Sequence, residues 1–398
     1  MRRSQQHNNH QMAEIQGTCD PRIEELRTHL KQLVDSGDEV GAAIAVNLDG
    51  QDVVDIWGGY ADKENNQPWN RDTIVNIFST TKNILSLAIL ILIDRKVFSI
   101  YDKVSKLWPE FATNGKENIE IRHILSHTSG VSGWDADRPL SFEEISNLGE
   151  ANAKLAAQAP WWTPGSASGY HTWTFGHLLG EIVRRATGKT LQEFVMEEIV
   201  APLGADFQFG VVERDLPRTS DVIPAPLPKL PPGVGPQPGS ITFRTMNPMP
   251  FPSTFANGAS WRQGHVLSAS GHTNARALAR ILSAISLGGS VDGKKFLSED
   301  TIDKIFEEQS NGVDLVTNMP LRFGVGYGIT GDGNTAIAEW LPNGRVCFWG
   351  GMGGSFAVMD LDRKLTITYV MNKMSMTGLG NDAFKEYAKI VYKALDRA

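Results

Sequence analysis

Strand-like segments lie at both ends of this chain, and this feature constrains its fold most. Residues 41–62 form two β-rich runs joined at Asn47–Gly50, which is typical of a hairpin. Three more β-rich runs occupy residues 345–351, 355–362 and 364–372, separated by tight turns. Runs so far apart in sequence share a sheet only if the two chain ends meet. We therefore expect one antiparallel sheet built from both termini, with helices on its faces.

Amphipathic periodicity predicts helices around and between these strands. In residues 21–36, Ile23, Leu26, Leu30 and Leu33 recur at three- and four-residue spacing, which places them on one helix face. Further helices are predicted at 82–95, 118–127, 142–157, 173–187, 191–200, 274–287 and 382–395. Because most of them lie in the middle of the chain, we expect a mostly helical lobe beside the sheet.

The expected organisation has two lobes and a leader. Residues 19–78 and 270–398 form an α/β lobe of the α+β type, and residues 79–269 form the helical lobe. Residues 1–18 are polar and are expected to be a disordered leader rather than a secretory signal. Residues 217–252 hold 11 of the 20 prolines, so neither a regular helix nor a central strand is expected there. A surface loop and a lid remain alternatives for this segment.

The composition excludes several classes of function. The 398 residues are 41% hydrophobic and 21% charged, which suits a chain with a substantial core. The net charge of −7 disfavours a dedicated binder of nucleic acid or of anionic membranes. The longest apolar run, Ile84 to Ile93, is far shorter than the ~20 residues that a membrane span needs. Two distant cysteines, Cys19 and Cys347, suit a reducing compartment, so we expect a soluble, cytoplasmic protein.

The candidate chemistry begins with Ser79 and Lys82, where a β-like run ends at Phe78 and an apolar helix begins. On a helix, residues three apart share one face, one turn from each other. A serine hydroxyl needs a neighbouring base to act as a nucleophile, and lysine is such a base once its pKa is lowered. The alternative is that Ser79 is a helix cap and Lys82 is solvated.

Two further segments support the chemical interpretation. Tyr170 lies in the Gly/Ser-rich loop 164–172, and a phenol near two cations would be partly phenolate and share protons with Lys82. Residues 348–355, Phe-Trp-Gly-Gly-Met-Gly-Gly-Ser, lie between two expected strands. Their glycines would let a substrate carbonyl approach backbone amides, as an oxyanion hole requires. The alternatives are a half-buried tyrosine and a glycine-rich hairpin.

These segments, in this order and spacing, resemble the penicillin-recognising serine hydrolases, which include class C β-lactamases, D-Ala-D-Ala peptidases and family VIII carboxylesterases. Residues 75–82, 122–130, 164–170 and 271–276 resemble the carboxylesterase branch in particular. The similarity extends from about residue 40 to residue 395. It implies a β-lactamase/transpeptidase-like fold.

The resemblance also implies a role for each motif residue. Ser79 would be the acylated nucleophile and Lys82 its general base or proton shuttle. Tyr170 would pass the proton to the leaving group and activate the deacylating nucleophile. The backbone amides of Ser79 and Met352 would form the oxyanion hole. No metal and no cofactor are implied.

Two departures from the β-lactamase pattern indicate the substrate. Thr172 stands where Asn or Ser is common, and Trp349-Gly350-Gly351 replaces Lys-Thr-Gly. A Lys-Thr pair supplies a cation and a hydroxyl for a carboxylate, whereas Trp-Gly supplies neither. We therefore expect a serine carboxylesterase that acts on neutral esters with small or medium acyl groups. The expected substrate-binding residues are Trp349, Gly350, Gly351, Thr172, His171 and Trp134.

Three alternatives to ester hydrolysis remain. Acyl transfer to an alcohol or amine, as in secondary-metabolite tailoring, would use the same Ser-Lys-Tyr set. β-Lactamase or D-aminopeptidase activity is the second, and a non-catalytic scaffold is the third. In each catalytic case the partner is a small-molecule ester or acyl substrate, without nucleic acid or membrane, and the sequence indicates no oligomeric state.

Histidines and other tryptophans are expected to have structural roles. His123 and His127 are four residues apart, but Ile124 occupies the position where a zinc-protease helix needs Glu. A packing role is the alternative to substrate contact for His171, and packing is the default for the remaining tryptophans.

Overall fold

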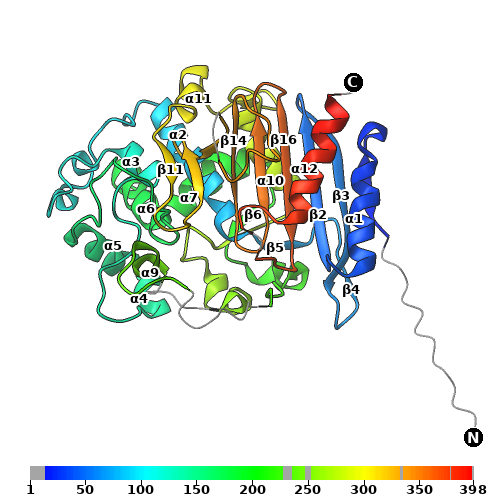
Figure 1. Cartoon of the computed structure of the whole chain (residues 1–398), viewed down its shortest axis with the longest axis horizontal. Helices are drawn as coiled ribbons and strands as arrows, with labels where there is room; N and C mark the ends of the chain where they lie inside the picture. The colour runs from blue at the N-terminus through cyan, green and yellow to red at the C-terminus, as the bar shows by residue number, and fades with distance from the viewer. Residues whose placement is uncertain (1–13, 227–234, 247–251, 332–334, 377, 397–398) are drawn as a thin grey trace, which may run out of the picture.

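One antiparallel sheet of ten strands joins the two ends of the chain (Figure 1). The computed structural model describes residues 14–226, 235–246, 252–331, 335–376 and 378–396. β2 (Gly41–Leu48) and β3 (Gln51–Asp62) form the expected hairpin. β16 (Leu365–Met371) pairs with β2 from Leu365 opposite Leu48 to Met371 opposite Ala42. The prediction of a sheet built from both termini is confirmed.

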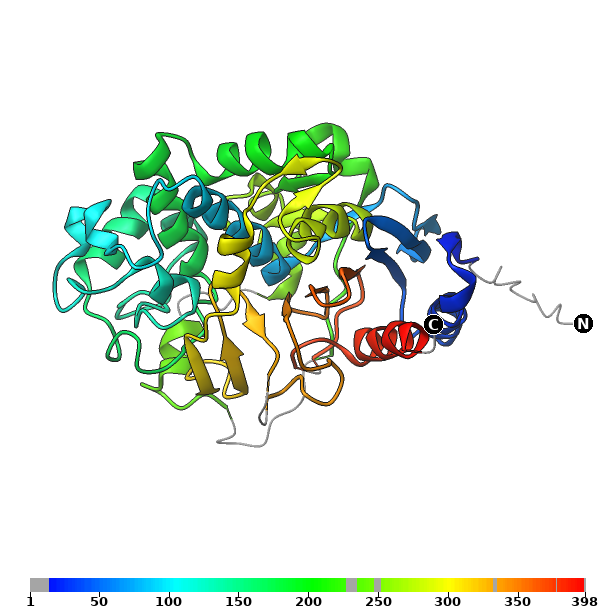
Figure 2. The same cartoon turned by 90° about the horizontal axis from the view of Figure 1, so that it is seen from above.

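Helices cover both faces of this sheet, whose strand order is β1-β3-β2-β16-β15-β14-β13-β12-β11, with β4 paired to β3. α10 (Ala275–Ser286) packs against β2, β15 and β16 on one face. α1 (Glu25–Ser36) and α12 (Asp382–Leu395) pack together on the other face (Figures 1 and 2). β16 is buried along its whole length because both of its faces are covered. The other strands are β1 (Gln16–Cys19), β4 (Gln67–Pro68), β11 (Ser310–Val313), β12 (Pro320–Phe323), β13 (Gly328–Ile329), β14 (Val346–Gly350) and β15 (Phe356–Asp360).

α2 (Lys82–Asp94) connects the sheet to the helical part of the molecule. Every residue from Lys82 to Ile93 is buried, as befits a helix that is apolar on all sides. It packs against α6 (Thr174–Thr187) and α7 (Leu191–Val195) as well as against β14 and α10. The first residue of α2, Lys82, therefore lies deep in the protein.

Shorter elements complete the described chain. The remaining helices are α3 (Ile121–Leu125), α4 (Phe142–Ser146), α5 (Leu148–Ala157), α8 (Ala201–Leu203), α9 (Ile241–Met246) and α11 (Glu299–Ile305). β6 (Phe207–Phe209), β8 (Gly271–Thr273), β5 (Ile74–Asn76) and β7 (Thr219–Ser220) form a small sheet in that order, and β9 (Ser290–Val291) pairs with β10 (Lys294–Lys295). Within the described residues, no helix has the length and apolarity to cross a membrane.

Four predicted helices differ from the observed ones. The helix expected at 21–36 starts with a 3-10 turn at Pro21–Ile23, and α1 begins only at Glu25. The helix expected at 118–127 covers only Ile121–Leu125, and His127 beyond it has a left-handed backbone with φ of 62°. The helix expected at 142–157 is broken at Asn147, which ends α4 and caps α5 by accepting a hydrogen bond from the Glu150 amide. Residues 191–200 pass from α7 into a π turn at Met196–Val200.

Two predictions about irregular segments are also corrected. Residues 16–18, expected in a disordered leader, belong to β1 and pair with β3, whereas residues 1–13 lie outside the described residues. In the proline-rich segment, α9 forms where no proline occurs, between Pro238 and Pro248. Residues 227–234 and 247–251 of that segment lie outside the described residues.

Glu39 is a buried carboxyl group beneath α12. Its side chain accepts a hydrogen bond at Oε1 from the Tyr369 hydroxyl, and Oε2 has no partner among the described residues. Burial raises the pKa of Glu39 to about 8 from a usual value of 4.5, although the bond from Tyr369 opposes this change. The folded protein therefore keeps Glu39 protonated at neutral pH.

We predict that Glu39→Gln removes a pH dependence of stability. The unfolded chain ionises Glu39 above pH 4.5 but the folded chain only near pH 8, so wild-type stability falls as the pH rises between these values. The loss is about 1.4 kcal/mol per pH unit. Glutamine keeps an acceptor for Tyr369 and cannot ionise. Urea unfolding at pH 5 and pH 8 measures the change, and Glu386→Gln, at an exposed residue of α12, should keep the wild-type slope. An unchanged slope in Glu39→Gln contradicts the prediction.

Candidate active site

Ser79 lies in a tight 3-10 turn, Phe78–Thr81, between β5 and α2. Phe78 has a φ of 44°, a left-handed conformation that bulky residues rarely adopt. Asn76 fixes this turn. Its Nδ2 donates to the carbonyls of Ala269 (3.0 Å) and Gly271 (3.2 Å), and its Oδ1 accepts from the Phe78 amide (3.3 Å). Surrounding hydrogen bonds thus hold the strained turn that presents Ser79.

The amine of Lys82 is buried against three oxygen atoms. Nζ lies 3.0 Å from Ser79 Oγ, 2.9 Å from the Thr172 carbonyl and 3.1 Å from the Ser268 carbonyl. Burial holds the pKa of Lys82 well below its usual value. A neutral amine has two hydrogens to donate and one lone pair. Because the two carbonyls can only accept, they take the hydrogens and leave the lone pair for the Ser79 hydroxyl.

Tyr170 completes a cluster of a hydroxyl, an amine and a phenol. Its hydroxyl group hydrogen-bonds to Ser79 and accepts a 3.0 Å bond from the indole N–H of Trp349. Lys82 Nζ lies 4.9 Å from the centre of the Tyr170 ring. Burial outweighs these two hydrogen bonds and raises the pKa of Tyr170. The expectation of a partial phenolate is therefore wrong, and the unliganded protein holds a neutral phenol.

The end of β14 lies directly against the Ser79 turn. A Cβ on Gly351 would be 2.2 Å from the Ile77 carbonyl oxygen, so only glycine permits this approach. Ser355 Oγ donates to the same carbonyl at 2.9 Å and ties the following loop to the turn. These contacts place Gly350, Gly351 and Met352 on the wall of the cavity that contains Ser79.

We call the cavity that contains Ser79, the predicted nucleophile, the catalytic cavity; its volume is about 410 Å³. Among the described residues, its lining contains no Asp, Glu, Lys, Arg or His side chain. Aromatic rings from Trp173 and Trp349 form part of the wall. Three methionines from separate segments form another part: Met246 of α9, Met319, and Met352 after β14. The cavity is therefore apolar apart from Ser79, Tyr170 and a few threonines.

Most of the chain matches one known protein family. The family model for beta-lactamase covers residues 26–391. The chain belongs to the beta-lactamase family. It is 30% identical over 354 residues to the protein named esterase/beta-lactamase LipL of Mycobacterium tuberculosis, a match that covers 84% of this chain and 77% of that protein.

Solved structures show the same fold in other proteins. A family VIII carboxylesterase superposes with a TM-score of 0.87 at 30% identity, covering 96% of this chain and 100% of that one. A penicillin-binding protein homologue from Caulobacter crescentus superposes with a TM-score of 0.86 at 33% identity, covering 96% and 99%. The expected β-lactamase/transpeptidase-like fold is confirmed.

Two residues expected to bind substrate lie outside the catalytic cavity. His171 is fully buried between Ser129 Oγ (2.6 Å) and the Gly169 carbonyl (2.7 Å), and burial lowers its pKa to about 4. Trp134 is buried and donates its indole N–H to the Ala151 carbonyl at 3.0 Å. Neither lines the cavity. In the irregular loop around Tyr170, successive side chains point to opposite sides, so His171 faces the core while its neighbours face the cavity.

The other expected residues do line the cavity. Thr172 contributes its carbonyl to Lys82, and its hydroxyl lies 3.6 Å from the sulfur of Met246. Trp349 is more than an apolar wall, because its N–H contacts the Tyr170 oxygen. Ser79 and Met352, whose amides the resemblance assigns to an oxyanion hole, both border the cavity.

Both paired histidines make structural contacts. His123 Nδ1 accepts from the Glu120 amide, and His127 Nδ1 accepts from the His171 amide, each at 3.1 Å. The His127 ring packs edge-on against Tyr170 with centres 4.8 Å apart. In the described part of the chain, no group of three or more His, Cys, Asp or Glu side chains could hold a metal ion.

Sequence analysis misses several residues of this site. Trp173 is assigned to packing yet lines the cavity, and Met246 and Met319 belong to no motif. Ser268 accepts from Lys82 at its backbone carbonyl, and its hydroxyl donates to the Trp173 carbonyl (2.8 Å) and accepts from the Gly176 amide (2.6 Å), yet it belongs to no motif. For Met246, the sequence gives one indication of an ordered position: it lies in the proline-free stretch that forms α9.

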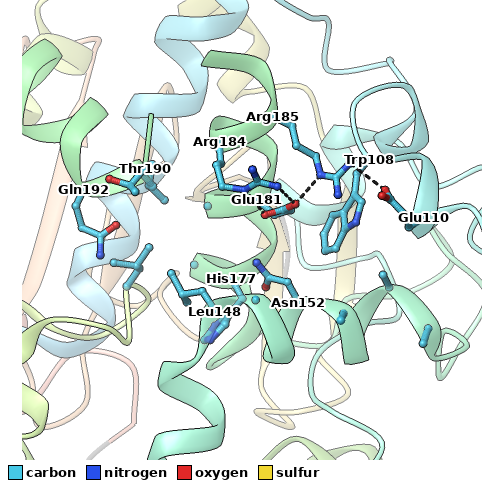
Figure 3. A pocket seen from close by; sticks show the side chains of 18 of the residues that line it. Trp108, Glu110, Leu148, Asn152, His177, Glu181, Arg184, Arg185, Thr190 and Gln192 are labelled. Atoms are coloured by element: carbon cyan, nitrogen blue, oxygen red, sulfur yellow. Dashed lines mark hydrogen bonds and ion pairs between the residues drawn. The ribbon is translucent and has the colours of Figure 1, made fainter. Parts of the chain in front are cut away.

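A second cavity, of about 820 Å³, lies between α5 and α6 (Figure 3). Its charged groups pair with one another: Glu181 with Arg184 (2.7 Å) and Arg185 (2.5 Å), and Glu110 with Arg185 (2.9 Å). His177 is the candidate base of this cavity, and both of its ring nitrogens already face backbone carbonyls. The described lining of the cavity therefore has no nucleophile–base pair like Ser79 and Lys82.

We predict that Lys82→Arg abolishes the reactivity of Ser79 toward a fluorophosphonate. Arginine keeps donors for the two carbonyls but stays protonated, so it cannot accept the Ser79 proton. The expected loss is about 100-fold or more. Wild-type reactivity should fall as the pH drops through the lowered pKa of Lys82, because only the neutral amine acts as a base.

The matched control is Lys116→Arg. Lys116 is also buried and donates to backbone carbonyls, of Thr113 at 2.8 Å and of Gln158, but away from Ser79. Mass spectrometry follows the labelling. Retention of wild-type reactivity by Lys82→Arg would contradict the assignment of Lys82 as the base.

We predict that Trp349→Phe lowers kcat about tenfold, the equivalent of one hydrogen bond of ~1.4 kcal/mol. The bond from Trp349 lowers the pKa of Tyr170, so its loss makes phenolate harder to form. Trp173→Phe is the control, because it shortens another cavity wall but its Nε1 has no partner among the described residues. Equal losses of kcat in the two variants would show that the Trp349 hydrogen bond has no effect.

Proposed function

We propose that the protein is a serine carboxylesterase that hydrolyses neutral esters with small or medium acyl groups through a Ser79 acyl-enzyme. The observation that carries this proposal is the combination of the Ser79–Lys82–Tyr170 cluster with a cavity whose described lining has no charged side chain. A substrate carboxylate would lose its hydration there without gaining an ionic partner. A neutral ester pays no such penalty.

The relatives support this choice of substrate. One is named an esterase/beta-lactamase and another a carboxylesterase, and both match at 30% identity over most of this chain. Trp349 at the first position of the third motif supplies a neutral N–H where a lysine would supply a cation. Ester hydrolysis is therefore favoured over β-lactam hydrolysis at this site.

Acylation begins with neutral Lys82 and neutral Tyr170. Ser79 Oγ attacks the ester carbonyl carbon as its proton moves to Lys82 Nζ, 3.0 Å away. The carbonyl oxygen gains negative charge, for which we propose the amides of Ser79 and Met352 as donors. The C–O bond to the alcohol then breaks, and the leaving oxygen takes the phenol proton of Tyr170. The Lys82 ammonium beside the ring returns a proton to the phenolate.

Deacylation uses the same groups in the reverse sense. The oxygen of a water molecule attacks the acyl carbon as its proton passes to the Tyr170 hydroxyl, which gives its own proton to neutral Lys82. The bond to Ser79 Oγ breaks, and the proton returns to that oxygen. The net reaction consumes one ester and one water and releases one acid and one alcohol. An alcohol in place of water would give acyl transfer with identical residues.

We also propose that the site forms where two lobes meet. Ser79 and Tyr170 come from residues 79–269, while Trp349 and Met352 come from residues 270–398. The cytoplasm is our proposed compartment, because Cys19 and Cys347 are free thiols.

A fluorophosphonate followed by intact-mass measurement tests the proposed nucleophile. Wild type should gain one phosphonyl group and Ser79→Ala none, while Ser166→Ala, an exposed serine of the Tyr170 loop, should label like wild type.

We predict faster turnover of p-nitrophenyl butyrate than of a cephalosporin, because the cavity offers no cation to a carboxylate. The reverse order would reject the substrate class. Product partition with and without added alcohol distinguishes hydrolysis from acyl transfer.

A further inference from the structure

Asp314 is a fully buried side chain at the turn after β11. Its Oδ1 accepts four hydrogen bonds: from the amides of Tyr170 (3.2 Å), Val316 (3.0 Å) and Thr317 (2.8 Å), and from the Thr317 hydroxyl (3.2 Å). Its Oδ2 has no partner among the described residues. One oxygen atom therefore gathers donors from two segments that are more than a hundred residues apart in sequence.

These two segments carry different parts of the active site. One ends in Tyr170, whose phenol contacts Ser79. The other supplies Val316, Thr317 and Met319 to the wall of the catalytic cavity. The amide of Leu315 also donates to the Ser168 carbonyl at 2.8 Å, so the two segments run side by side at Asp314.

The same turn supports α9. Thr242 Oγ1 donates to the carbonyls of Leu315 (3.1 Å) and Val316 (3.0 Å). α9 in turn places Thr242 and Met246 on the cavity wall. Movement of the turn would therefore change both the cavity wall and the support of α9.

We propose that Asp314 is a positioning residue that sets the Tyr170 phenol and the cavity wall relative to each other. The inference rests on the proposed esterase function and assigns no bond-making step to Asp314. It acts through Tyr170, Val316 and Thr317, because the structure places its carboxylate against their amides rather than in the cavity lining. A displacement of about 1 Å in such a site lowers the rate on the order of 100-fold.

The charge of Asp314 has a second effect on Tyr170. Burial is the main cause that raises the pKa of Tyr170, and Asp314 raises it further, whereas the hydrogen bonds with Ser79 and Trp349 lower it. The other titratable groups that face the ring are Lys82 and His127, and burial lowers the pKa of both. The charge of Asp314 thus acts on the pKa of Tyr170 in the same direction as burial and in the opposite direction to Trp349.

Two substitutions separate position from charge. Asp314→Asn keeps the Oδ1 acceptor and removes the charge, whereas Asp314→Ala removes both. Asp360→Ala is the matched control, since Asp360 is equally buried and accepts from the Arg363 amide at 3.0 Å, but at the far end of β15 from Gly350. It should lower the Tm and leave kcat unchanged.

Steady-state kinetics with butanoyl and octanoyl esters, together with thermal unfolding, tests the proposal. We expect Asp314→Ala to lose about 100-fold in kcat and to change the ratio of KM values for the two esters. Asp314→Asn should stay within about tenfold of wild-type kcat, because it keeps the acceptor that faces the Tyr170, Val316 and Thr317 amides. A folded Asp314→Ala with wild-type kcat would overturn the proposal, as would equal losses of kcat in the two variants.

A readout without turnover separates this proposal from the proposed function. The side-chain NMR signal of Tyr170, assigned with Tyr170→Phe, should move in Asp314→Ala and stay near its wild-type position in Asp314→Asn. An unmoved signal in Asp314→Ala rejects positioning even if esters are hydrolysed. If wild type shows neither labelling nor turnover, the proposed esterase function is rejected. A moved Tyr170 signal in Asp314→Ala would still support the positioning role of Asp314. If the alanine variant does not fold, Asp314→Ser replaces it in the same comparison.

Discussion

The burial of the Lys82 amine is the constraint on which the site depends. In the described part of the chain it meets two carbonyls and one hydroxyl rather than a carboxylate. A carboxylate would hold the amine as an ammonium ion, whereas burial among neutral oxygens favours the free base. The wholly buried helix α2 provides this environment, because its other contacts exclude water from its first turn. Packing and basicity are therefore consequences of the same apolar helix.

The neighbouring groups are arranged around this neutral base. Tyr170 lies over the amine as a phenol, and Trp349 faces its oxygen with an uncharged donor. Gly351 allows the β14 strand to approach the Ser79 turn more closely than any residue with a Cβ would permit. The unliganded site thus combines the predicted nucleophile, base and phenol with a described cavity lining that has no charged side chain. This lack of charge is the reason why we expect this protein to prefer neutral esters to anionic substrates.

Local sequence patterns are sufficient for the parts of the structure that depend on local physics. The β2–β3 hairpin, the three C-terminal strands and α12 follow from apolar runs and turn residues. Ser79, Lys82 and Tyr170 follow from motif spacing together with family resemblance. The break at Asn147 is a cap that competes with helical periodicity, which a count of apolar positions does not detect.

Contacts between distant segments are the part that the sequence does not reveal. His171 follows Tyr170 in sequence, which suggests a contact with substrate. Its ring instead contacts Ser129 Oγ and the Gly169 carbonyl in the protein interior, and the sequence does not show this direction. Asp314 lies far from every motif, and its importance emerges only when its oxygen is seen against the Tyr170 amide. Ser268 reaches Lys82 with its backbone carbonyl and Trp173 with its hydroxyl, and no local pattern predicts either contact.

The three methionines of the cavity wall limit how sharply this protein can discriminate. Thioether side chains are unbranched and polarisable, so they adjust to differently shaped neighbours at little cost. Met246 and Met352 are also 41% and 42% exposed, which leaves them room to change rotamer. If esters bind in this cavity, we expect such adaptable walls to give a gradual dependence of binding on acyl size rather than a sharp cut-off. Replacing these residues with branched or aromatic side chains is thus the natural route by which a narrow selectivity would evolve on this scaffold.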